Sequence, residues 1–445
     1  MIDRRNMMAG GVALTAASAV PSWSGIPASS PFVRVTGQQF KRGGRRYPVI
    51  GTNMWYAAYL GADAPFGNRA RLGRELDRLK VLGVNNVRIL GASEQSPLHG
   101  AVTPTFRGAG SSYDPALLGG LDWALHELGK RGMTAVIYTN NFWEWSGGMA
   151  AYQTYTNGGT FVEAVDPKRP WTDFPDFVAG FYENPKAIAL ADEYLRALVG
   201  RTNRLTGVRY ADDPTIMAWQ LANEPRPAGT DAVYARTYPA YLRWLRTTAQ
   251  LIKSIDPNHL VSTGSEGAMG CLQKAACVAD TNAIAAIDYV TIHIWPRNFG
   301  WVDAKDLPGT YEAGAKNTLA YIADHVALAR RLNKPVVIEE FGFPRDGAGY
   351  APGSATMFKD RYYRLLLDAV VAGVRSGGPL AGANFWAWNG EGRAQHPDHL
   401  FQPGDTAFVG DPPHEPQGMY GVFDNDRTTI AVLRDWSRAM RKAVA

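Results

Sequence analysis

Short apolar runs alternate with longer amphipathic stretches along most of this chain. From about residue 46 onward, eight such runs are rich in Val, Ile, Tyr and Trp, which is typical of strands buried on both faces. The eight predicted strands span residues 47–53, 84–90, 134–139, 215–221, 259–263, 289–295, 335–341 and 381–386. Strands of this kind are characteristic of a parallel sheet that is covered by helices.

The stretches between the strands carry apolar residues at helical spacing. In residues 69–83, Leu recurs every three or four positions and forms one apolar face. Residues 114–131 begin with an Asp that can cap a helix, and the Gly that follows them is a residue that often ends one. Further helices are predicted at residues 184–202, 233–255, 313–332, 358–372 and 428–444.

Strands that alternate with helices indicate parallel crossover units, and eight such units are what a closed (β/α)8 TIM barrel requires. A doubly wound open sheet is the alternative, and it is less favoured because no Gly-rich phosphate turn follows the first strand. The long loops nearly all follow strands, which in a barrel places them on the face that carries function. These loops span residues 91–113, 140–183, 264–284, 295–312 and 387–427. We therefore predict an α/β fold with one (β/α)8 domain over residues 31–445, whose long loops form a cleft.

The first 30 residues have the layout of an export signal. Arg4 and Arg5 precede an apolar stretch, residues 7–20, which small residues and Pro21 follow. The paired Arg favours the twin-arginine route, and ordinary secretion is the alternative. The apolar stretch is too short to span a bilayer comfortably, and no second segment of spanning length follows it. We predict a secreted or periplasmic protein without a membrane span.

Composition narrows the choice of partners. The net charge is +5 over 445 residues, but no dense run of Lys and Arg and no nucleic-acid motif occurs, so we predict no nucleic-acid partner. The two cysteines, Cys271 and Cys277, lie close together. In an exported protein a disulfide between them is favoured over two free thiols. No His or further Cys lies near them in the sequence, so we predict no zinc site and no metal there.

Two glutamates stand at predicted strand ends. Glu224 comes just after the fourth strand, and Glu340 lies at the end of the seventh. The carboxyl ends of barrel strands share one face, so we expect the two carboxylates to meet there. Two opposed carboxylates perform glycoside hydrolysis, in which one protonates the leaving oxygen and the other attacks the anomeric carbon or activates water. A single strand-end Glu more often pairs with Arg or Lys, but two at one level favour catalysis.

Aromatic residues gather at the same strand ends. Their flat faces can bury the apolar faces of sugar rings while polar neighbours meet the hydroxyls. For any one of them, packing under a long loop is the alternative. The residues in question are Trp55, Tyr56, Trp143, Trp145, Trp295, Trp301, Trp386 and Trp388.

Several motifs resemble glycoside hydrolase family 5, a retaining family of (β/α)8 enzymes, and more closely its endo-β-1,4-mannanases. The likeness runs from about residue 46 to the C-terminus, with the motifs in the family's order. The motifs are Gly51-Thr52-Asn53, residues 141–148, Asn223-Glu224-Pro225-Arg226, His293-Ile294-Trp295-Pro296, residues 337–342, Asn384-Phe385-Trp386 and residues 411–418.

The resemblance implies a role for each site residue. It makes Glu224 the acid/base and Glu340, rather than its neighbour Glu339, the nucleophile. Asn223 would hold the sugar 2-hydroxyl, where a hydrogen bond that strengthens in the transition state helps most. Arg88 would orient Glu340 and keep it ionised, because a nearby cation lowers the pKa of a carboxyl group.

The remaining substrate contacts follow from the same likeness. His293 would bind near the acid/base, and Trp386 would form the floor of the subsite where cleavage occurs. Arg226 matches a residue that the mannanases use on the leaving-group side. We also predict substrate contacts for the other strand-end residues, Trp55, Asn141, Trp143 and Trp295.

Two positions depart from the family pattern. The family usually has a Tyr that bonds the nucleophile where this chain has Trp295, and Trp donates only through its indole nitrogen. The His that many members carry at the end of the third strand is replaced in this region by Tyr138 and Asn140. Neither departure touches the two carboxylates.

These features predict a retaining endo-β-1,4-mannanase. Its substrate would be β-mannan, meaning mannan, glucomannan or galactomannan, and it would cleave internal bonds. We predict that the enzyme is a monomer and needs no metal or organic cofactor. A β-1,4-glucanase of the same family is the nearest alternative, because the sequence does not resolve how the sugar 2-hydroxyl is read. A non-catalytic glycan-binding barrel is less favoured, because both Glu are present.

Overall fold

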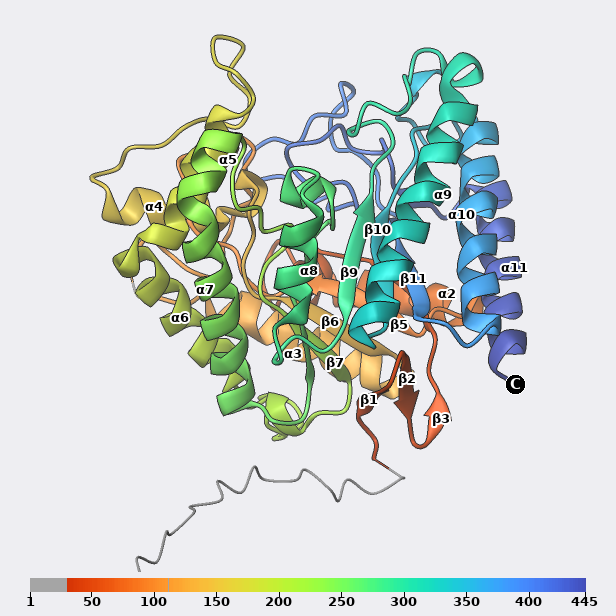
Figure 1. Ribbon diagram of the computed structural model, residues 1–445, viewed down its shortest axis with the longest axis horizontal. Coiled ribbons are helices and arrows are strands. Elements are labelled where there is room, and N and C mark those ends of the chain that lie inside the picture. The colour runs from red at the N-terminus through yellow and green to blue at the C-terminus, as the bar shows by residue number, and fades with distance from the viewer. Residues whose placement is uncertain (1–29, 111) are drawn as a thin grey trace, which may run out of the picture.

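The computed structural model describes residues 30–110 and 112–445, and its centre is one parallel sheet of eight strands curved into a barrel (Figure 1). The eight predicted strands are all confirmed, with ends that differ by one or two residues. In sheet order they are β8 (Leu260–Ser262), β7 (Ile216–Gln220), β6 (Thr134–Tyr138), β5 (Asn86–Leu90), β4 (Val49–Asn53), β11 (Leu380–Phe385), β10 (Val336–Phe341) and β9 (Val290–Ile294). Every residue of these strands is buried, as expected of a sheet with both faces covered.

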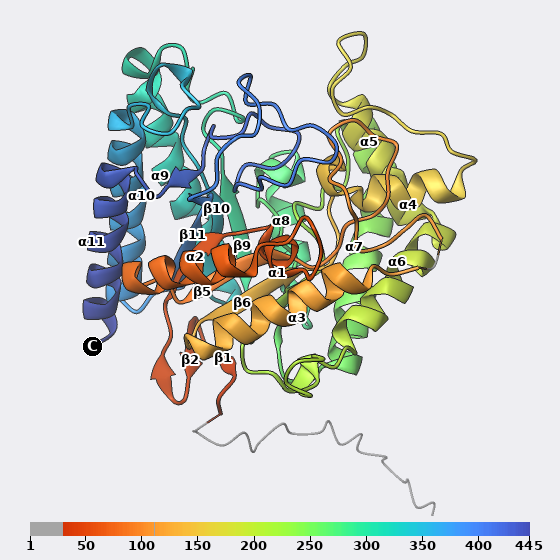
Figure 2. The same cartoon turned by 180° about the vertical axis from the view of Figure 1, so that it is seen from behind.

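A ring of helices packs around the strands and buries the outer face of the barrel (Figures 1 and 2). The predicted helices are present, and the predicted cap is confirmed, because Asp114 accepts hydrogen bonds from two backbone N–H groups of α3. Asn184 caps α6 in the same way, through one backbone N–H group. The long helices are α2 (Arg69–Leu82), α3 (Pro115–Lys130), α6 (Pro185–Val199), α7 (Asp231–Ile255), α9 (Leu307–Leu332), α10 (Met357–Arg375) and α11 (Arg427–Val444).

The strand ladder is interrupted at one seam, between β8 and β9. Among the described residues these two strands share no strand pairing, yet they are tied together at both ends. At the lower end the Asp288 carboxylate accepts a hydrogen bond from the Val261 amide at 2.6 Å, and the Asp288 amide donates to the Val261 carbonyl. At the upper end the His293 amide donates to the Glu266 carbonyl at 3.2 Å. These bonds complete the barrel as a (β/α)8 fold.

A hairpin that the sequence did not predict covers the lower end of the barrel. It consists of β1 (Val33–Thr36), β2 (Gln39–Arg42) and β3 (Arg45–Arg46), which pair in antiparallel order below the sheet (Figure 1). Val33 and Phe40 are buried against residues from the lower ends of the strands, and the Phe40 ring lies edge-on to Tyr289 at 5.3 Å. The hairpin therefore closes one end of the barrel and leaves the other end free for a site.

The loops after the strands lie at the opposite end and contain short elements that the sequence did not predict. These elements are α1 (Ala57–Gly61), η1 (Glu144–Ser146), α4 (Gly148–Thr156), α5 (Asp173–Ala179), η2 (Gly180–Glu183), η4 (Met269–Cys271), α8 (Ala275–Ala283), η5 (Asp346–Ala348), β12 (Trp388–Gly390) and β13 (Val422–Phe423). A further short helix, η3 (Tyr210–Asp212), lies in the segment between α6 and β7. A disulfide joins Cys271 to Cys277 in the loop after β8. In the described part of the chain, none of the helices combines the length and apolar character needed to cross a membrane. The predicted export signal lies outside the described residues, apart from residue 30.

Candidate active site

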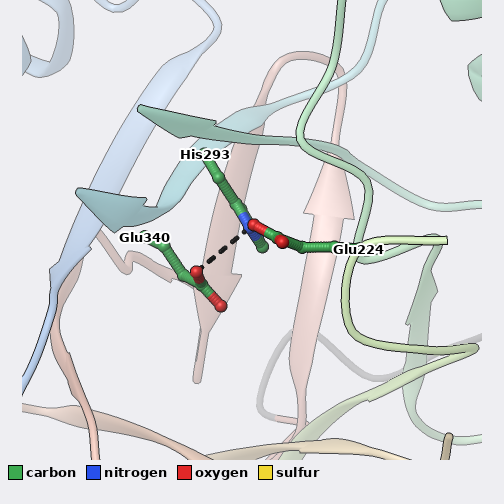
Figure 3. A group of neighbouring side chains, drawn as sticks. All are labelled: Glu224, His293 and Glu340. Carbon is green, nitrogen blue, oxygen red and sulfur yellow. Dashed lines mark hydrogen bonds and ion pairs between the residues drawn. The ribbon is translucent and has the colours of Figure 1, made fainter. Parts of the chain in front are cut away.

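Glu224 and Glu340 come from opposite sides of the barrel and meet at its open end (Figure 3). Glu224 follows β7, and Glu340 is the fifth residue of β10. Both are buried, and an oxygen of one carboxylate lies within 4.8 Å of an oxygen of the other. Two glutamates that are 116 positions apart in the sequence are thus held face to face by rigid strands.

His293, at the upper end of β9, lies between the two carboxylates (Figure 3). Its Nδ1 atom is 2.6 Å from Oε1 of Glu224 and 3.3 Å from Oε2 of Glu340. Burial opposes a charge on this imidazole, but Glu340 and Glu224 together raise the pKa of His293 to about 10. The three groups are close enough to hold a metal ion. With its raised pKa, the imidazole of His293 carries a positive charge between the two carboxylates.

Glu224 is held by donors on both of its oxygens. His293 bonds one oxygen, and the indole N–H of Trp143 donates to the other. Burial by itself would raise the pKa of Glu224, but the bonds from His293 and Trp143 and the charge of Arg226 bring it below its ordinary value. The backbone of Glu224 has φ of 51°, in the left-handed region that residues with a Cβ rarely adopt. The pairing of its amide with the Gly264 carbonyl at 2.9 Å helps to fix this turn.

Glu340 also has a donor on each oxygen. The guanidinium of Arg88 forms an ion pair with Oε1, and the indole nitrogen of Trp295 lies 3.3 Å from Oε2. The neighbouring Glu339 points away from Glu340, and its carboxylate accepts hydrogen bonds from Gln220 and Tyr289 inside the barrel. Burial raises the pKa of Glu339. The structure therefore places Glu340, and not Glu339, opposite Glu224.

Arg88 connects Glu340 to the amide side chains around it. Its other nitrogen atoms donate to Gln220 at 2.8 Å and to Asn223 at 2.7 Å. Asn223 in turn donates to the side-chain oxygen of Asn141 at 3.1 Å, and the two Asn residues form an isolated parallel bridge beyond the ends of β6 and β7. Arg88 also lies over the ring of Tyr138 at 4.5 Å. This network fixes the side chain of Asn223 next to both carboxylates.

The carboxylates open into a cavity of about 690 Å³ that the long loops surround. Its floor near Glu340 is the ring of Trp386, which lies edge-on to Trp295 at 5.6 Å. The indole N–H of Trp386 is buried and has no partner among the described residues. Other residues that line the cavity are Trp143, Glu144, Trp145, Ala164, Val165, Trp171, Asn223, Arg226, Ala228, Gly229, Glu266, Met269, Leu272, Gln273, Asn298, Phe299, Pro412, His414 and Glu415.

Beyond Glu224 the cavity is lined by a charged pair on aromatic support. Arg226 makes two parallel hydrogen bonds to Glu266, at 2.6 and 2.7 Å, and its guanidinium lies 4.9 Å from the ring of Trp143 and 5.5 Å from that of Trp171. Burial raises the pKa of Glu266 to about 7, although Arg226 opposes the rise. Glu266 and Trp171 were not predicted as site residues.

Four of the predicted substrate contacts lie behind the cavity wall. Trp55 points into the core, 1% exposed, where its ring packs edge-on against Trp145 and Phe408, and it is not among the residues that line the cavity. Arg88, Asn141 and His293 are fully buried too, and they act on the carboxylates and on Asn223 rather than lining the cavity.

The comparisons with known proteins agree with this geometry. Residues 30–445 match the family described as "GH family 5 beta-mannosidase-like". The chain is 28% identical over 383 residues to mannan endo-1,4-beta-mannosidase 4 of Solanum lycopersicum, covering 82% of this chain and 86% of the relative. It is 31% identical to a glycoside hydrolase family 5 mannosidase mutant from Rhizomucor miehei solved in complex with mannosyl-fructose, with a TM-score of 0.84 and coverage of 93% and 98%. An endo-1,4-beta-mannanase from the same fungus shares the fold, at 23% identity, a TM-score of 0.67 and coverage of 92% and 99%.

Proposed function

We propose that this protein cleaves β-1,4-mannosidic bonds by double displacement. The chain belongs to glycoside hydrolase family 5 and to its β-mannosidase-like group, and the proposal starts from that membership. The observation that carries the proposal is that one carboxylate oxygen of Glu224 lies within 4.8 Å of one carboxylate oxygen of Glu340. Retaining glycosidases hold their carboxyl groups about 5–5.5 Å apart, whereas inverting ones need about 6.5–9.5 Å to admit a water molecule. The gap supports a nucleophile and an acid/base rather than a pair that activates water directly.

In the first step, an oxygen of Glu340 attacks the anomeric carbon, and the bond from that carbon to the leaving oxygen breaks. Arg88 and Trp295 hold the Glu340 carboxylate in line. Glu224 delivers a proton to the leaving oxygen. In the second step Glu224 removes a proton from water, the water oxygen bonds to the anomeric carbon, and Glu340 is released.

The proton for the first step is held between His293 and Glu224. In the empty site it resides on His293, whose pKa is raised to about 10, and Nδ1 lies 2.6 Å from Glu224 Oε1. Transfer across this bond gives a neutral Glu224 beside an uncharged imidazole. In the second step, the proton that Glu224 takes from water returns to His293 and so restores the starting state. No external base is consumed.

The choice of mannose rests on relatives rather than on a contact to the sugar. The names of the tomato and fungal proteins both refer to mannosidases. In this chain, Asn223 is oriented by Arg88 and Asn141 at the position where it would meet the 2-hydroxyl, the group that is axial in mannose and equatorial in glucose. Trp386 would support the ring of the sugar that Glu340 attacks.

Two modes of attack fit this chemistry. The sequence predicts cleavage of internal bonds, and the name of the tomato relative supports that mode. The fungal mannosidase was solved with mannosyl-fructose, a ligand with one mannosyl unit, which supports attack at a chain end. The modes differ in how many sugars the glycone side must hold: several for internal cleavage and one for a chain end.

We also propose that the enzyme is exported and acts as a monomer. The support for export is the signal-like layout of residues 1–30 together with the Cys271–Cys277 disulfide, a bond that persists in oxidising compartments. Size-exclusion chromatography and N-terminal sequencing of the protein recovered outside the cytoplasm test these two points.

The test of the double displacement is the configuration of the first product. Proton NMR of a 4-nitrophenyl β-mannoside digest should show β-mannose first, with the α-anomer appearing only by mutarotation. Parallel assays on mannohexaose and carboxymethylcellulose should give sugar release from the mannan substrate alone. An α-configured first product, or preference for cellulose, would contradict the proposal.

A further inference from the structure

Arg226 and Glu266 lie on the side of the cavity where the leaving group departs. In the proposed function Glu224 protonates the leaving oxygen. Burial raises the pKa of Glu224, and Arg226 is near enough for its charge to oppose that rise. Met269, three positions after Glu266, lines the same cavity. Because Glu266 bonds Arg226 through both of its carboxylate oxygens, whatever fixes residues 266–269 also fixes the guanidinium.

Two side chains of α9 hold this segment in place. The Tyr321 hydroxyl donates to the carbonyl oxygen of Glu266 at 2.6 Å and accepts a hydrogen bond from the Met269 amide at 3.1 Å. One turn along the helix, the Nε2 atom of His325 accepts from the Ala268 amide at 3.0 Å. Both side chains are buried, and α9 lies alongside β9 in the barrel (Figure 1). This wall of the cavity is therefore positioned by a helix that does not itself line the cavity.

Gly267 brings the segment close to His325. Its φ of 90° lies in the left-handed region, and a Cβ built on it would lie 2.4 Å from Nε2 of His325. No side chain fits between the loop and the imidazole at this point. A change in the hydrogen bond at Nε2 is therefore passed directly to the backbone of the loop.

The two hydrogen bonds of His325 require a neutral imidazole. Its Nδ1 atom is 2.7 Å from the carbonyl oxygen of Tyr321, which only accepts, so Nδ1 carries the proton. Its Nε2 atom faces the Ala268 amide, which only donates, so Nε2 carries none. A second proton would set two N–H groups against each other and break the bond from Ala268. Burial favours the neutral form as well, and it lowers the pKa of His325 below the ordinary 6.5.

The charged groups around His325 do little to stabilise a second proton. Asp324, on the same helix, favours the charged form but is exposed to solvent. Tyr321 has its ring 4.2 Å away, and burial raises its pKa, so it stays uncharged. From the loop after β8, Glu266 directs its carboxylate to its guanidinium partner. From β9, the charge of His293 lies between the two catalytic carboxylates.

We propose that Tyr321 and His325 position the Arg226–Glu266 pair for the leaving group, and that protonation of His325 releases the pair. The bond from Ala268 is complete above about pH 6.5 and is lost as the pH falls through the lowered pKa of His325. Binding of a long leaving group should weaken over that interval, whereas the carboxylates that react are not moved. This inference rests on the proposed function and deepens it by naming what controls its leaving-group side.

The test measures KM and kcat of the full-length enzyme between about pH 4.5 and about pH 8, on mannohexaose and on 4-nitrophenyl β-mannoside. As the pH falls below about 6.5, KM of the wild type for mannohexaose should rise by about 3- to 10-fold, the effect of losing one hydrogen bond, while KM for the nitrophenyl substrate changes less. His325→Gln offers the Ala268 amide a side-chain oxygen and gains no proton, so its KM should rise less. Glu266 titrates in the same interval, because burial raises its pKa to about 7, but both proteins contain it. The difference between the two pH profiles therefore reports His325.

Tyr321→Phe is the second variant. It removes the hydroxyl that bonds Glu266 and Met269, and it should raise KM for mannohexaose by about 2- to 10-fold at every pH with kcat near the wild-type value. His126→Gln is the matched control for the loss of an imidazole, since His126 lies on α3 and outside the cavity lining. This control should keep the wild-type pH profile.

Hydrogen exchange gives a readout that needs no turnover. Corrected for the intrinsic rate, exchange of the Ala268 amide below about pH 6.5 should be about 10-fold or more faster in the wild type than in His325→Gln. Coincident profiles for the two proteins, in kinetics and in exchange, would overturn the inference and leave β-mannoside hydrolysis intact. Equal losses on both substrates would also overturn it, because the two side chains would then act on the reacting groups. No turnover of either β-mannoside would overturn the proposed function and the inference with it.

Discussion

The indole N–H of Trp295 points at Oε2 of Glu340, with 3.3 Å between the two heavy atoms. Arg88 bonds the other oxygen of the same carboxylate, so both oxygens of Glu340 have a donor before substrate arrives. The ring of Trp295 is fixed from behind by Gly342, where a Cβ would lie 2.4 Å from the ring. Trp295 thus supplies the hydrogen bond that the family's usual Tyr would make.

Trp295→Phe should therefore lower kcat by about 10-fold or more, because a hydrogen bond to a charged group contributes about 1.5–3 kcal/mol. Trp295→Tyr restores an O–H donor and should retain more activity than the Phe variant. Trp301→Phe is the control, since Trp301 lies outside the cavity lining. Equal kcat for the Phe variant and the wild type would show that the bond has no role in turnover.

Glu224→Gln and Glu340→Gln should each lower kcat by about 10²–10⁴-fold or more on mannohexaose. The two variants should separate on 4-nitrophenyl β-mannoside, whose leaving group departs without a proton. There the first step of Glu224→Gln is largely preserved and gives a burst of nitrophenol, whereas Glu340→Gln stays inactive. Glu312→Gln, at an exposed ion pair with Arg361, is the control for the change itself. Similar behaviour of the two active-site variants on this substrate would contradict their separate roles.

Arg88→Met should reduce the free energy of unfolding by about 3–5 kcal/mol, since it leaves Glu340 buried without its cation. Denaturant unfolding, with kcat measured in parallel, provides the test. Arg88→Lys keeps the charge but cannot bond Glu340, Gln220 and Asn223 together. The stability of this variant should therefore lie between those of the wild type and Arg88→Met. If Arg88→Met were as stable as the wild type, the hydrogen bonds of Arg88 would not contribute to folding.

The charge on His293 makes stability depend on pH in a defined window. The folded pKa of about 10 lies above the ordinary value of 6.5, so the stabilisation is complete below about pH 6.5 and is lost as the pH rises toward 10. Thermal unfolding midpoints of the wild type should fall over this interval more than those of His293→Gln, which has no titrating proton there. Parallel curves for the two proteins would refute a charged His293.

The Cys271–Cys277 disulfide closes a short loop, with a sequence separation of 6, and Leu272 and Gln273 of this loop line the cavity. Replacing both cysteines by Ser should cost about 2 kcal/mol of stability, as expected for so short a loop. KM for mannohexaose should rise more than KM for the nitrophenyl mannoside, because only the longer substrate reaches Leu272. An equal change in both would assign the disulfide to stability alone.

The barrel was predictable because its strands are buried on both faces, a pattern that needs no knowledge of tertiary contacts. The N-terminal hairpin was missed because Val33–Thr36 and Gln39–Arg42 are short and half polar, and only their partners at the base of the barrel make Val33 and Phe40 core residues. The local pattern therefore determined the sheet but not the segment that closes it.

The site divides in the same way. Glu224, Glu340 and their supporting residues stand at strand ends, so their convergence follows from the fold. Trp55 stands at a strand end too, but the turn into α1 directs its ring into the core, which spacing alone does not reveal. His414 is 270 positions from Glu144, and their contact depends on how two loops fold over the barrel, which no periodicity encodes.

The left-handed backbone of Glu224 places selection for stability and selection for catalysis in opposition at one position. A residue with a Cβ at φ of 51° costs of order 1 kcal/mol, whereas Gly adopts this conformation freely and Asn does so more readily than Glu. Gly or Asn at this position would relieve the backbone strain, but it would leave the charged His293 with one carboxylate partner instead of two. A directed-evolution screen that rewards heat resistance without assaying turnover should therefore accumulate Gly or Asn at position 224 together with a neutral residue at position 293.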